Sequence, residues 1–108
     1  MTVYYSRKKR TLSMSVLQQP MPDARLVAYV QTSGRCWYCG ISVALARGTI
    51  DHVVPVCAGG LGTQENIVFA CLACNKTKGH LSLEEFRVLC GVEKFWGQRH
   101  GGHQHGQQ

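Results

Sequence analysis

Two C-x-x-C pairs are the residues of this sequence whose spacing specifies chemistry most clearly. Cys36 and Cys39 form the first pair, and Cys71 and Cys74 form the second. Two residues between thiolates allow a tight turn to direct both sulfurs at one point, and two such turns supply the four ligands of a closed tetrahedral zinc site. We therefore predict a structural Zn²⁺ that stabilises the fold and leaves no coordination position open for catalysis.

The segment between the two pairs carries a second group of chemically capable residues. It is 31 residues long, whereas an ordinary zinc ribbon has roughly 15–20. In it, Asp51 and His52 interrupt the apolar, β-branched stretch TIDHVVPVCAGG. A neutral histidine can accept a proton near pH 7, because its ordinary pKa is about 6.5. Considered alone, an Asp-His pair is more often a hydrogen-bonded surface pair than a catalytic one.

Asparagines accompany this pair. Asn66 lies in the same segment between the cysteine pairs, and Asn75 follows the last cysteine. Asp51 and Asn75 both offer oxygen, the ligand type that hard cations such as Mg²⁺ and Mn²⁺ prefer. Thiolates, by contrast, are the ligand type that zinc prefers.

A helix, two strands and two further helical segments must position these residues. The stretch 22–34 predicts a short helix capped by Asp23, with Leu26, Val27 and Val30 on its apolar face. Strands are expected within 48–54 and 66–70, a helical turn at 74–80, and a helix from Ser82 to about Cys90. Ser82 and Glu85 form the sequence pattern of a capping box. Trp37 and Tyr38 are expected to pack beside the first cysteine turn rather than to stack on bases.

The pattern CWYCG…IDHVVPVCAGG…ENIVFACLACNKTKG resembles the HNH endonucleases, the ββα-metal nucleases, over residues 34–80. The D-H, N and C-x-x-C-N-x-x-K elements occur in order, at spacing similar to that of the family. The resemblance implies an α+β fold: a small ββα-metal finger, with a β-hairpin and a helix around one catalytic ion. The zinc site would staple this finger, and helices would flank it.

The resemblance also implies a role for each matching residue. His52 corresponds to the general base, and Asp51 and Asn75 correspond to ligands of a catalytic Mg²⁺ or Mn²⁺. Asn66 corresponds to the middle asparagine, which steadies the loop and orients the histidine, so this copy is of the H-N-N type. Lys78 corresponds to a basic residue positioned for phosphate. Neighbouring strand residues point to opposite faces, so Asp51 and His52 should splay apart unless the backbone twists or bulges.

Length and charge complete the prediction. The 108 residues fit one small domain, which we divide into a flexible basic lead (1–20), an HNH nuclease domain (21–96) and a disordered Gly/His/Gln-rich tail (97–108). The formal net charge of +6 suits a polyanion such as DNA. The basic residues expected to grip its backbone are Arg7, Lys8, Lys9, Arg10, Lys76 and Lys78.

We expect a metal-dependent endonuclease that hydrolyses DNA phosphodiester bonds in the cytoplasm, in a prokaryotic or phage-like context. No membrane association is expected, because no apolar run approaches the roughly 20 residues of a membrane span. Specificity would come from a homodimer or a larger protein assembly. RNA stays open as a substrate, as do the cleavage sequence and strandedness. The alternatives are a non-catalytic zinc module that binds nucleic acid, and an adaptor whose HNH shell is idle.

Overall fold

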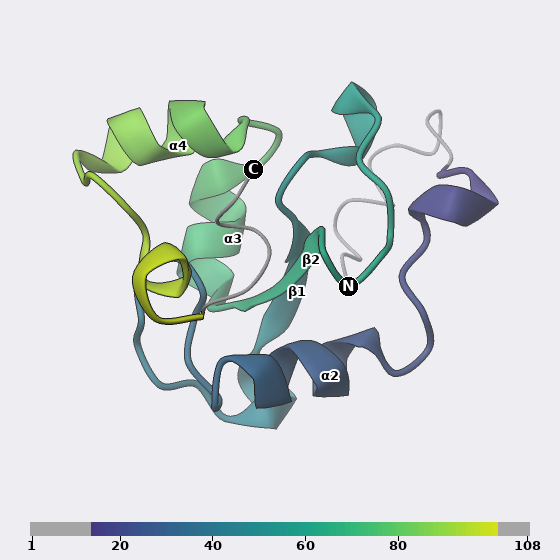
Figure 1. The fold of residues 1–108 in the computed structure, drawn as a ribbon, viewed down its shortest axis with the longest axis horizontal. Coiled ribbons are helices and arrows are strands. Elements are labelled where there is room, and N and C mark those ends of the chain that lie inside the picture. The colour runs from purple at the N-terminus through teal and green to yellow at the C-terminus, as the bar shows by residue number, and fades with distance from the viewer. Residues whose placement is uncertain (1–13, 102–108) are drawn as a thin grey trace.

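The computed structural model describes residues 14–101 and has the predicted α+β architecture (Figure 1). Two short antiparallel strands form a β-hairpin, and helices pack around it. The regular elements are α2 (Ala24–Gln31), β1 (Thr49–His52), β2 (Ile67–Ala70), α3 (Leu72–Lys78) and α4 (Leu83–Cys90). Short 3₁₀ turns lie at Val16–Gln18 (η1), Leu45–Arg47 (η2) and Val56–Ala58 (η3), and a π-helical turn lies at Gly97–Gly101.

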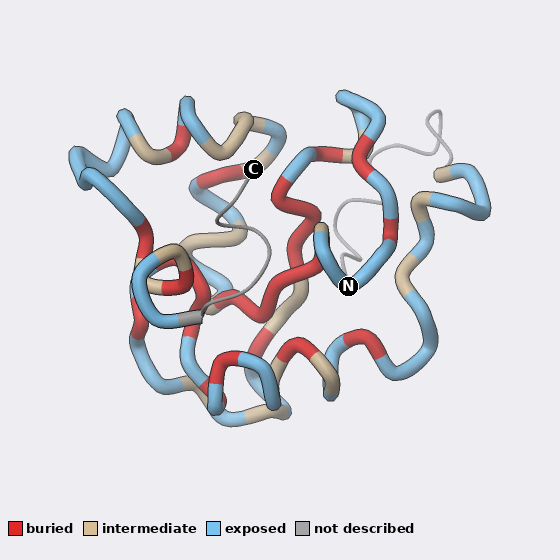
Figure 2. Tube along the Cα trace, in the orientation of Figure 1, coloured by how far each residue is buried: buried red, intermediate tan, exposed pale blue. Residues whose placement is uncertain are grey.

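The hairpin forms from the two predicted apolar runs. Asp51 pairs with Val68 and His52 pairs with Ile67 in antiparallel register. Every residue of β2 is buried, as expected of a continuous apolar strand with packing on both faces. Figure 2 shows this buried stretch at the centre of the molecule, with α2 and α3 beside it. The hairpin is thus the rigid element from which Asp51 and His52 project.

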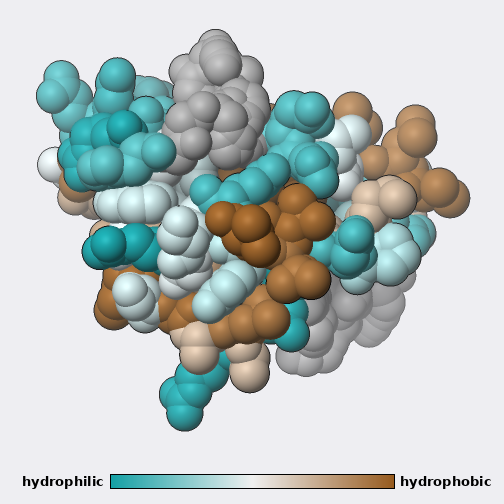
Figure 3. All heavy atoms as spheres, turned by 60° about the horizontal axis from the view of Figure 1, so that its bottom comes forward, coloured by the Kyte–Doolittle hydropathy of each residue, from teal (hydrophilic) through white to brown (hydrophobic). Residues whose placement is uncertain are grey.

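The helix α2 forms where it was predicted, but it buries a different face. Ala24 and Ala28 are buried, whereas Leu26 and Val30 are 52% and 65% exposed. Small residues allow the helix to approach β2 closely, and Tyr29 meets Phe69 edge to face at 5.2 Å. The prediction of an inward face built on Leu26 and Val30 was therefore wrong. Figure 3 shows hydrophobic side chains gathered on the face of the molecule that holds α2.

Two further details of the helices can be compared with the sequence. Asp23 occupies the N-cap position of α2, as predicted, but its side chain makes no capping hydrogen bond. The capping box of α4 is confirmed, because Ser82 Oγ accepts from the Glu85 amide and Glu85 Oε1 accepts from the Ser82 amide. This box fixes the start of α4, the helix that buries Phe86.

An aromatic cluster fills the space between the first cysteine turn and α4. Tyr38 contacts Phe86 and Phe95 with ring centroids 5.2 and 5.0 Å apart, and Trp37 contacts Tyr38 at 5.2 Å. Trp37 and Tyr38 are 1% and 2% exposed, which confirms that they pack in the core. The core therefore holds the cysteine turn against the C-terminal helix.

The flanks contain some regular structure. The turn η1 lies within the predicted lead 1–20, and Gly97–Gly101 lies within the predicted tail 97–108. The rest of the tail, and the basic cluster Arg7, Lys8, Lys9 and Arg10, lie outside the described residues. Within residues 14–101, no helix has the length and apolar character needed to cross a membrane.

Candidate active site and metal centre

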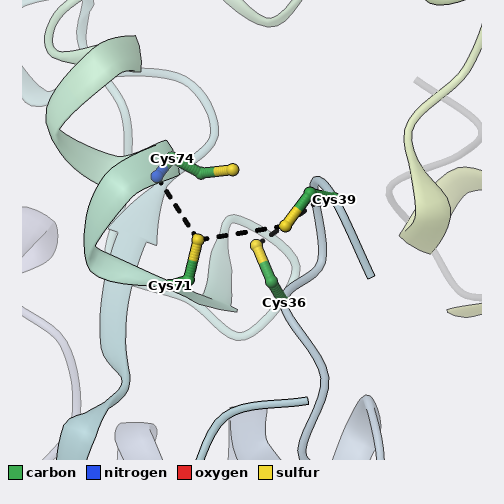
Figure 4. Close-up of side chains that lie close together, drawn as sticks. All are labelled: Cys36, Cys39, Cys71 and Cys74. Atoms are coloured by element: carbon green, nitrogen blue, oxygen red, sulfur yellow. Dashed lines mark hydrogen bonds between the residues drawn. The ribbon is translucent and has the colours of Figure 1, made fainter. Parts of the chain in front are cut away.

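The two cysteine pairs converge as predicted. The sulfurs of Cys36, Cys39, Cys71 and Cys74 all lie within 4.8 Å of one another, and Cys39 Sγ and Cys71 Sγ are 3.9 Å apart (Figure 4). Zinc–sulfur bonds of about 2.3 Å in a tetrahedron place the sulfurs about 3.8 Å apart. The four thiols therefore fit a Zn²⁺ ion. They are the one group of three or more His, Cys, Asp or Glu within residues 14–101 that could hold a metal ion.

Local structure directs the four sulfurs. The Cys39 amide donates to Cys36 Sγ at 3.5 Å, and the Cys74 amide donates to Cys71 Sγ at 3.4 Å. Cys71 is also the N-cap of α3. A hydrogen bond from the Cys74 thiol lowers the pKa of Cys36 to about 5, although burial opposes this shift. A thiolate at neutral pH is the form that binds zinc.

The His52 ring is held from outside the hairpin. Its Nε2 lies 2.8 Å from the main-chain carbonyl oxygen of Gln18. A carbonyl only accepts hydrogen bonds, so Nε2 must carry the proton, and in the neutral ring Nδ1 keeps the free lone pair. Burial lowers the pKa of His52, while the Gln18 carbonyl and Asp51 oppose this shift. The ring is therefore neutral at pH 7, as a general base must be.

A groove of about 580 Å³ opens beside His52. Its lining includes Arg25 of α2, Thr49 and Ile50 of β1, and the segment 20–22. Arg25 is exposed, and its Nη1 donates to the carbonyls of Leu45 and Gly48. The groove thus combines a neutral histidine with an exposed cation.

The neighbouring Asp51 faces a different set of groups. Its Oδ2 accepts a hydrogen bond from Tyr38 Oη at 2.5 Å and lies 3.1 Å from Lys78 Nζ. Burial raises the pKa of Asp51, while Lys78 and the Tyr38 hydroxyl oppose this shift by favouring the carboxylate. Asp51 and His52 therefore meet different elements, as expected for adjacent residues of a strand.

The buried position of Lys78 corrects one prediction. The side chain is 0% exposed, and its Nζ also donates to the main-chain carbonyl of His52 at 3.0 Å. A lysine in this position cannot reach a nucleic-acid backbone, so its assignment as a phosphate contact was wrong. Burying an ammonium is costly unless it is paired, and Asp51 supplies the pair. Lys76, two residues earlier on α3, is exposed.

The two asparagines make well-defined contacts. Asn66 Oδ1 accepts from the Val54 amide at 2.8 Å, and Asn66 Nδ2 donates to the carbonyls of Val54 and Leu61 at 3.1 and 2.8 Å. These bonds brace the loop after β1, whereas the bond to the His52 ring comes from Gln18. Asn75 Nδ2 donates to Thr49 Oγ1 and the Ile50 carbonyl at 2.8 and 3.1 Å, which ties α3 to β1.

The donor set of Asp51 and Asn75 fits a hard cation in chemical type. The amide nitrogen of Asn75 is used in the ties to β1, which leaves its Oδ1 as the atom that could coordinate a metal. On Asp51, Oδ2 is occupied by Tyr38 and Lys78, so Oδ1 is the corresponding atom. A cation bound there would share the carboxylate with the Lys78 ammonium.

The sequence analysis did not identify two residues that contribute to the site. Gln18 and Arg25 lie in the N-terminal part of the chain, before the first cysteine pair and outside the motif. Nothing in their spacing marks them, because both reach the site only through tertiary contacts 34 and 20 residues along the chain. The groups in the site thus come from both sides of the first cysteine turn.

The fold and the two sites together define a finger of the ββα type, with four clustered thiols that could hold a zinc ion. Residues 36–81 match the family model described as HNH endonuclease. Residues 36–81 are therefore HNH endonuclease-like, as the resemblance implied.

The similar curated proteins are much longer than this chain. A CRISPR-associated endonuclease Cas9 of Corynebacterium diphtheriae is 38% identical over 47 residues, which are 43% of this chain and 4% of that protein. A CRISPR-associated endonuclease Cas9 of Actinomyces naeslundii is 29% identical over 58 residues, 53% of this chain and 5% of that protein. Both matches are thus to one small part of a large protein.

A solved structure has the same fold. The crystal structure of the Type II-C Cas9 enzyme from Actinomyces naeslundii aligns with a TM-score of 0.60 at 22% identity. The alignment covers 84% of this chain and 10% of the other. At this level of identity the likeness establishes the fold alone.

Proposed function

We propose that this chain is a metal-dependent HNH endonuclease that hydrolyses phosphodiester bonds in DNA, with His52 as the general base. The observation that carries the proposal is the His52 ring, buried, neutral and lying on a groove at the D-H position of the family motif. A surface Asp-His pair would have no need of a fixed ring or of a groove.

In the proposed reaction, Nδ1 of His52 accepts a proton from the attacking water, and the nucleophile forms a bond to the scissile phosphorus. The bond to the leaving 3′ oxygen breaks, and that oxygen takes a proton from a solvent water, which gives 5′-phosphate and 3′-hydroxyl ends. Asp51 and Asn75 would hold the divalent ion, Mg²⁺ or Mn²⁺, which when bound supplies charge stabilisation to the phosphate and the leaving oxygen. Asn66 keeps the loop after β1 in place.

Arg25 takes the phosphate-binding role that the sequence suggested for Lys78. Its guanidinium is exposed and lies on the groove that holds His52. Its contacts with two carbonyls pre-orient it, so less entropy is lost when it binds a phosphate. Lys76 and the basic cluster Arg7–Arg10 would add contacts to the backbone that do not depend on sequence.

The partner is proposed to be DNA, because the relatives are named as CRISPR-associated endonucleases and the chain carries a formal net charge of +6. A homodimer or a larger assembly is proposed to supply specificity. The proposed compartment is the cytoplasm, where such DNA would be met.

The alternative function is a non-catalytic zinc module that binds nucleic acid. The observation that favours it is the ion pair between Lys78 and Asp51, which places a cation on the carboxylate that a metal would need. Under this alternative, the charge of Asp51 serves only to neutralise Lys78.

Binding and cleavage must be measured separately to distinguish the two functions. A labelled DNA duplex is titrated with wild type, His52→Ala and the matched control His100→Ala, whose ring lies on the exposed C-terminal turn. We expect all three to bind equally by anisotropy and only His52→Ala to lose cleavage in Mn²⁺. Binding by all three without cleavage by any would support the non-catalytic module.

A further inference from the structure

The segment 15–19, which we call the N-terminal strap, lies across the loop that follows β1. We propose that this strap is a positioning element of the active site: its Gln18 carbonyl fixes the His52 ring with the proton on Nε2 and makes Nδ1 the basic atom. The inference rests on the proposed function. It concerns residues outside 36–81, the part of the chain that matches the HNH family.

The strap is anchored to the loop by its main chain and by one side chain. The Gly62 amide donates to the Leu17 carbonyl at 2.8 Å, and Gln18 Nε2 donates to the Val56 carbonyl at 3.0 Å. Within the strap, the Gln18 amide donates to the Ser15 carbonyl at 2.9 Å. These bonds flank the Gln18 carbonyl and hold it 2.8 Å from His52 Nε2.

Apolar burial does not explain why the strap lies there. Val16 and Leu17 are 80% and 73% exposed, and no residue of η1 is buried. A segment that buries so little apolar surface gains little from the hydrophobic effect. Its interactions with the domain are hydrogen bonds, and one of these ends on the catalytic ring.

Gly62 shows how closely the strap approaches the loop. A Cβ at this position would lie 2.2 Å from the Gln19 carbonyl oxygen and 2.8 Å from the Gln18 carbonyl oxygen. Both atoms belong to the main chain, so the strap itself would have to move to make room. Gly62→Ala therefore displaces the strap without changing any group of the strap or of His52.

Loss of the contact with the Gln18 carbonyl would affect catalysis through the tautomer and the orientation of the His52 ring. Without the Gln18 carbonyl, the neutral ring is free to carry its proton on either nitrogen and to turn about its side-chain bonds. Only one tautomer and one orientation present a lone pair to the attacking water, so the reactive fraction of the enzyme falls. Binding of DNA through cationic side chains would be unaffected.

The test measures the tautomer directly. Zinc-loaded protein with ¹⁵N-labelled histidine is observed by long-range ¹⁵N–¹H correlation above pH 7.5, and the His52 signals are assigned from their loss in His52→Ala. We expect a protonated Nε2 and an unprotonated Nδ1 in wild type. Gly62→Ala should give signals averaged over both tautomers, and kcat should fall about tenfold or more while KM stays within about twofold.

Two more variants separate the effect of the strap's position from other effects of substitution. Leu17→Ala trims an exposed side chain of the strap and leaves its main-chain bonds, so it should match wild type. Gln18→Ala removes two side-chain bonds, the one donated to the Val56 carbonyl and the one accepted from the Ser15 amide, and leaves the Gln18 carbonyl in the chain. It should give a smaller shift in the same direction as Gly62→Ala, and it replaces that variant as the test if Gly62→Ala does not fold.

The inference is overturned if wild-type His52 carries its proton on Nδ1, or if Gly62→Ala and Gln18→Ala keep the wild-type tautomer and kcat. A wild type that shows the expected tautomer, loses it in Gly62→Ala and yet cuts no DNA would leave the strap's role intact and reject the nuclease function instead.

Discussion

Replacing Lys78 with methionine tests how the buried charge of Asp51 is balanced. Lys78 Nζ lies 3.1 Å from Asp51 Oδ2, and the two side chains are 0% and 9% exposed. Removing one partner of a buried ion pair leaves an uncompensated charge and costs about 3–5 kcal/mol. In a domain of this size, that loss lowers Tm by more than about 10 °C. Lys76→Met is the matched control, because it changes an exposed lysine of the same helix.

A divalent ion should reverse part of this loss if Asp51 is a metal ligand. The ion would take the place of the Lys78 ammonium as the counter-charge, and at about 100 times its Kd it would add about 2.7 kcal/mol of stability. Thermal unfolding of zinc-loaded protein is therefore measured in EDTA-free buffer with and without Mn²⁺. We expect Mn²⁺ to raise the Tm of Lys78→Met more than that of wild type.

The pH dependence of the stability lost in Lys78→Met tests the same reasoning. Burial raises the pKa of Asp51, and Lys78 opposes that shift, so the variant should have a still higher Asp51 pKa. The penalty comes from the ionised form, so the deficit relative to wild type is complete above that pKa and shrinks as pH falls through it. A Lys78→Met variant within about 3 °C of wild type at pH 7, or a deficit that grows on acidification, would refute the reasoning.

Three other changes have defined outcomes. Cys39→Ser should lower zinc content below one ion per chain and unfold the domain at 25 °C by circular dichroism, because zinc binding is part of the folding energy; a folded, zinc-free variant would contradict the metal assignment. Asn66→Ala should cost about 1–3 kcal/mol in urea unfolding through the lost bonds to Val54 and Leu61, and an unchanged midpoint would argue against a bracing role. Arg25→Ala should raise KM for DNA and reduce by about one the slope of log binding constant against log salt concentration. The control Arg87→Ala should change neither quantity. Equal effects of the two substitutions would contradict a phosphate contact by Arg25.

Much of the fold follows from local patterns. The hairpin was predictable because β-branched runs at 48–54 and 66–70 are bounded by turn residues. The cysteine cluster followed from the spacing of the two C-x-x-C pairs, and the start of α4 followed from the pattern of Ser82 and Glu85. In each case the determining contacts lie within a few residues, or the ligand chemistry itself forces distant residues together.

The errors arose where tertiary packing decides. The inward face of α2 was assigned to its larger apolar residues, but close approach to β2 selects Ala24 and Ala28 instead. The motif predicts a phosphate contact for Lys78 because the residue is basic and follows the last cysteine pair. In the structure Lys78 is buried beside Asp51 and acts as its counter-ion. The contact between Gln18 and His52 joins residues far apart in the chain through a main-chain atom, which no side-chain pattern can reveal.

Cleavage of supercoiled plasmid by zinc-loaded protein tests the central claim most directly. Wild type and His52→Ala are compared side by side with Mg²⁺, with Mn²⁺ and with EDTA, after both are shown to be equally folded and zinc-loaded. The account predicts nicked or linear plasmid only for wild type and only with a divalent ion. Cleavage by His52→Ala at the wild-type rate, or wild-type cleavage that persists in EDTA, would contradict it.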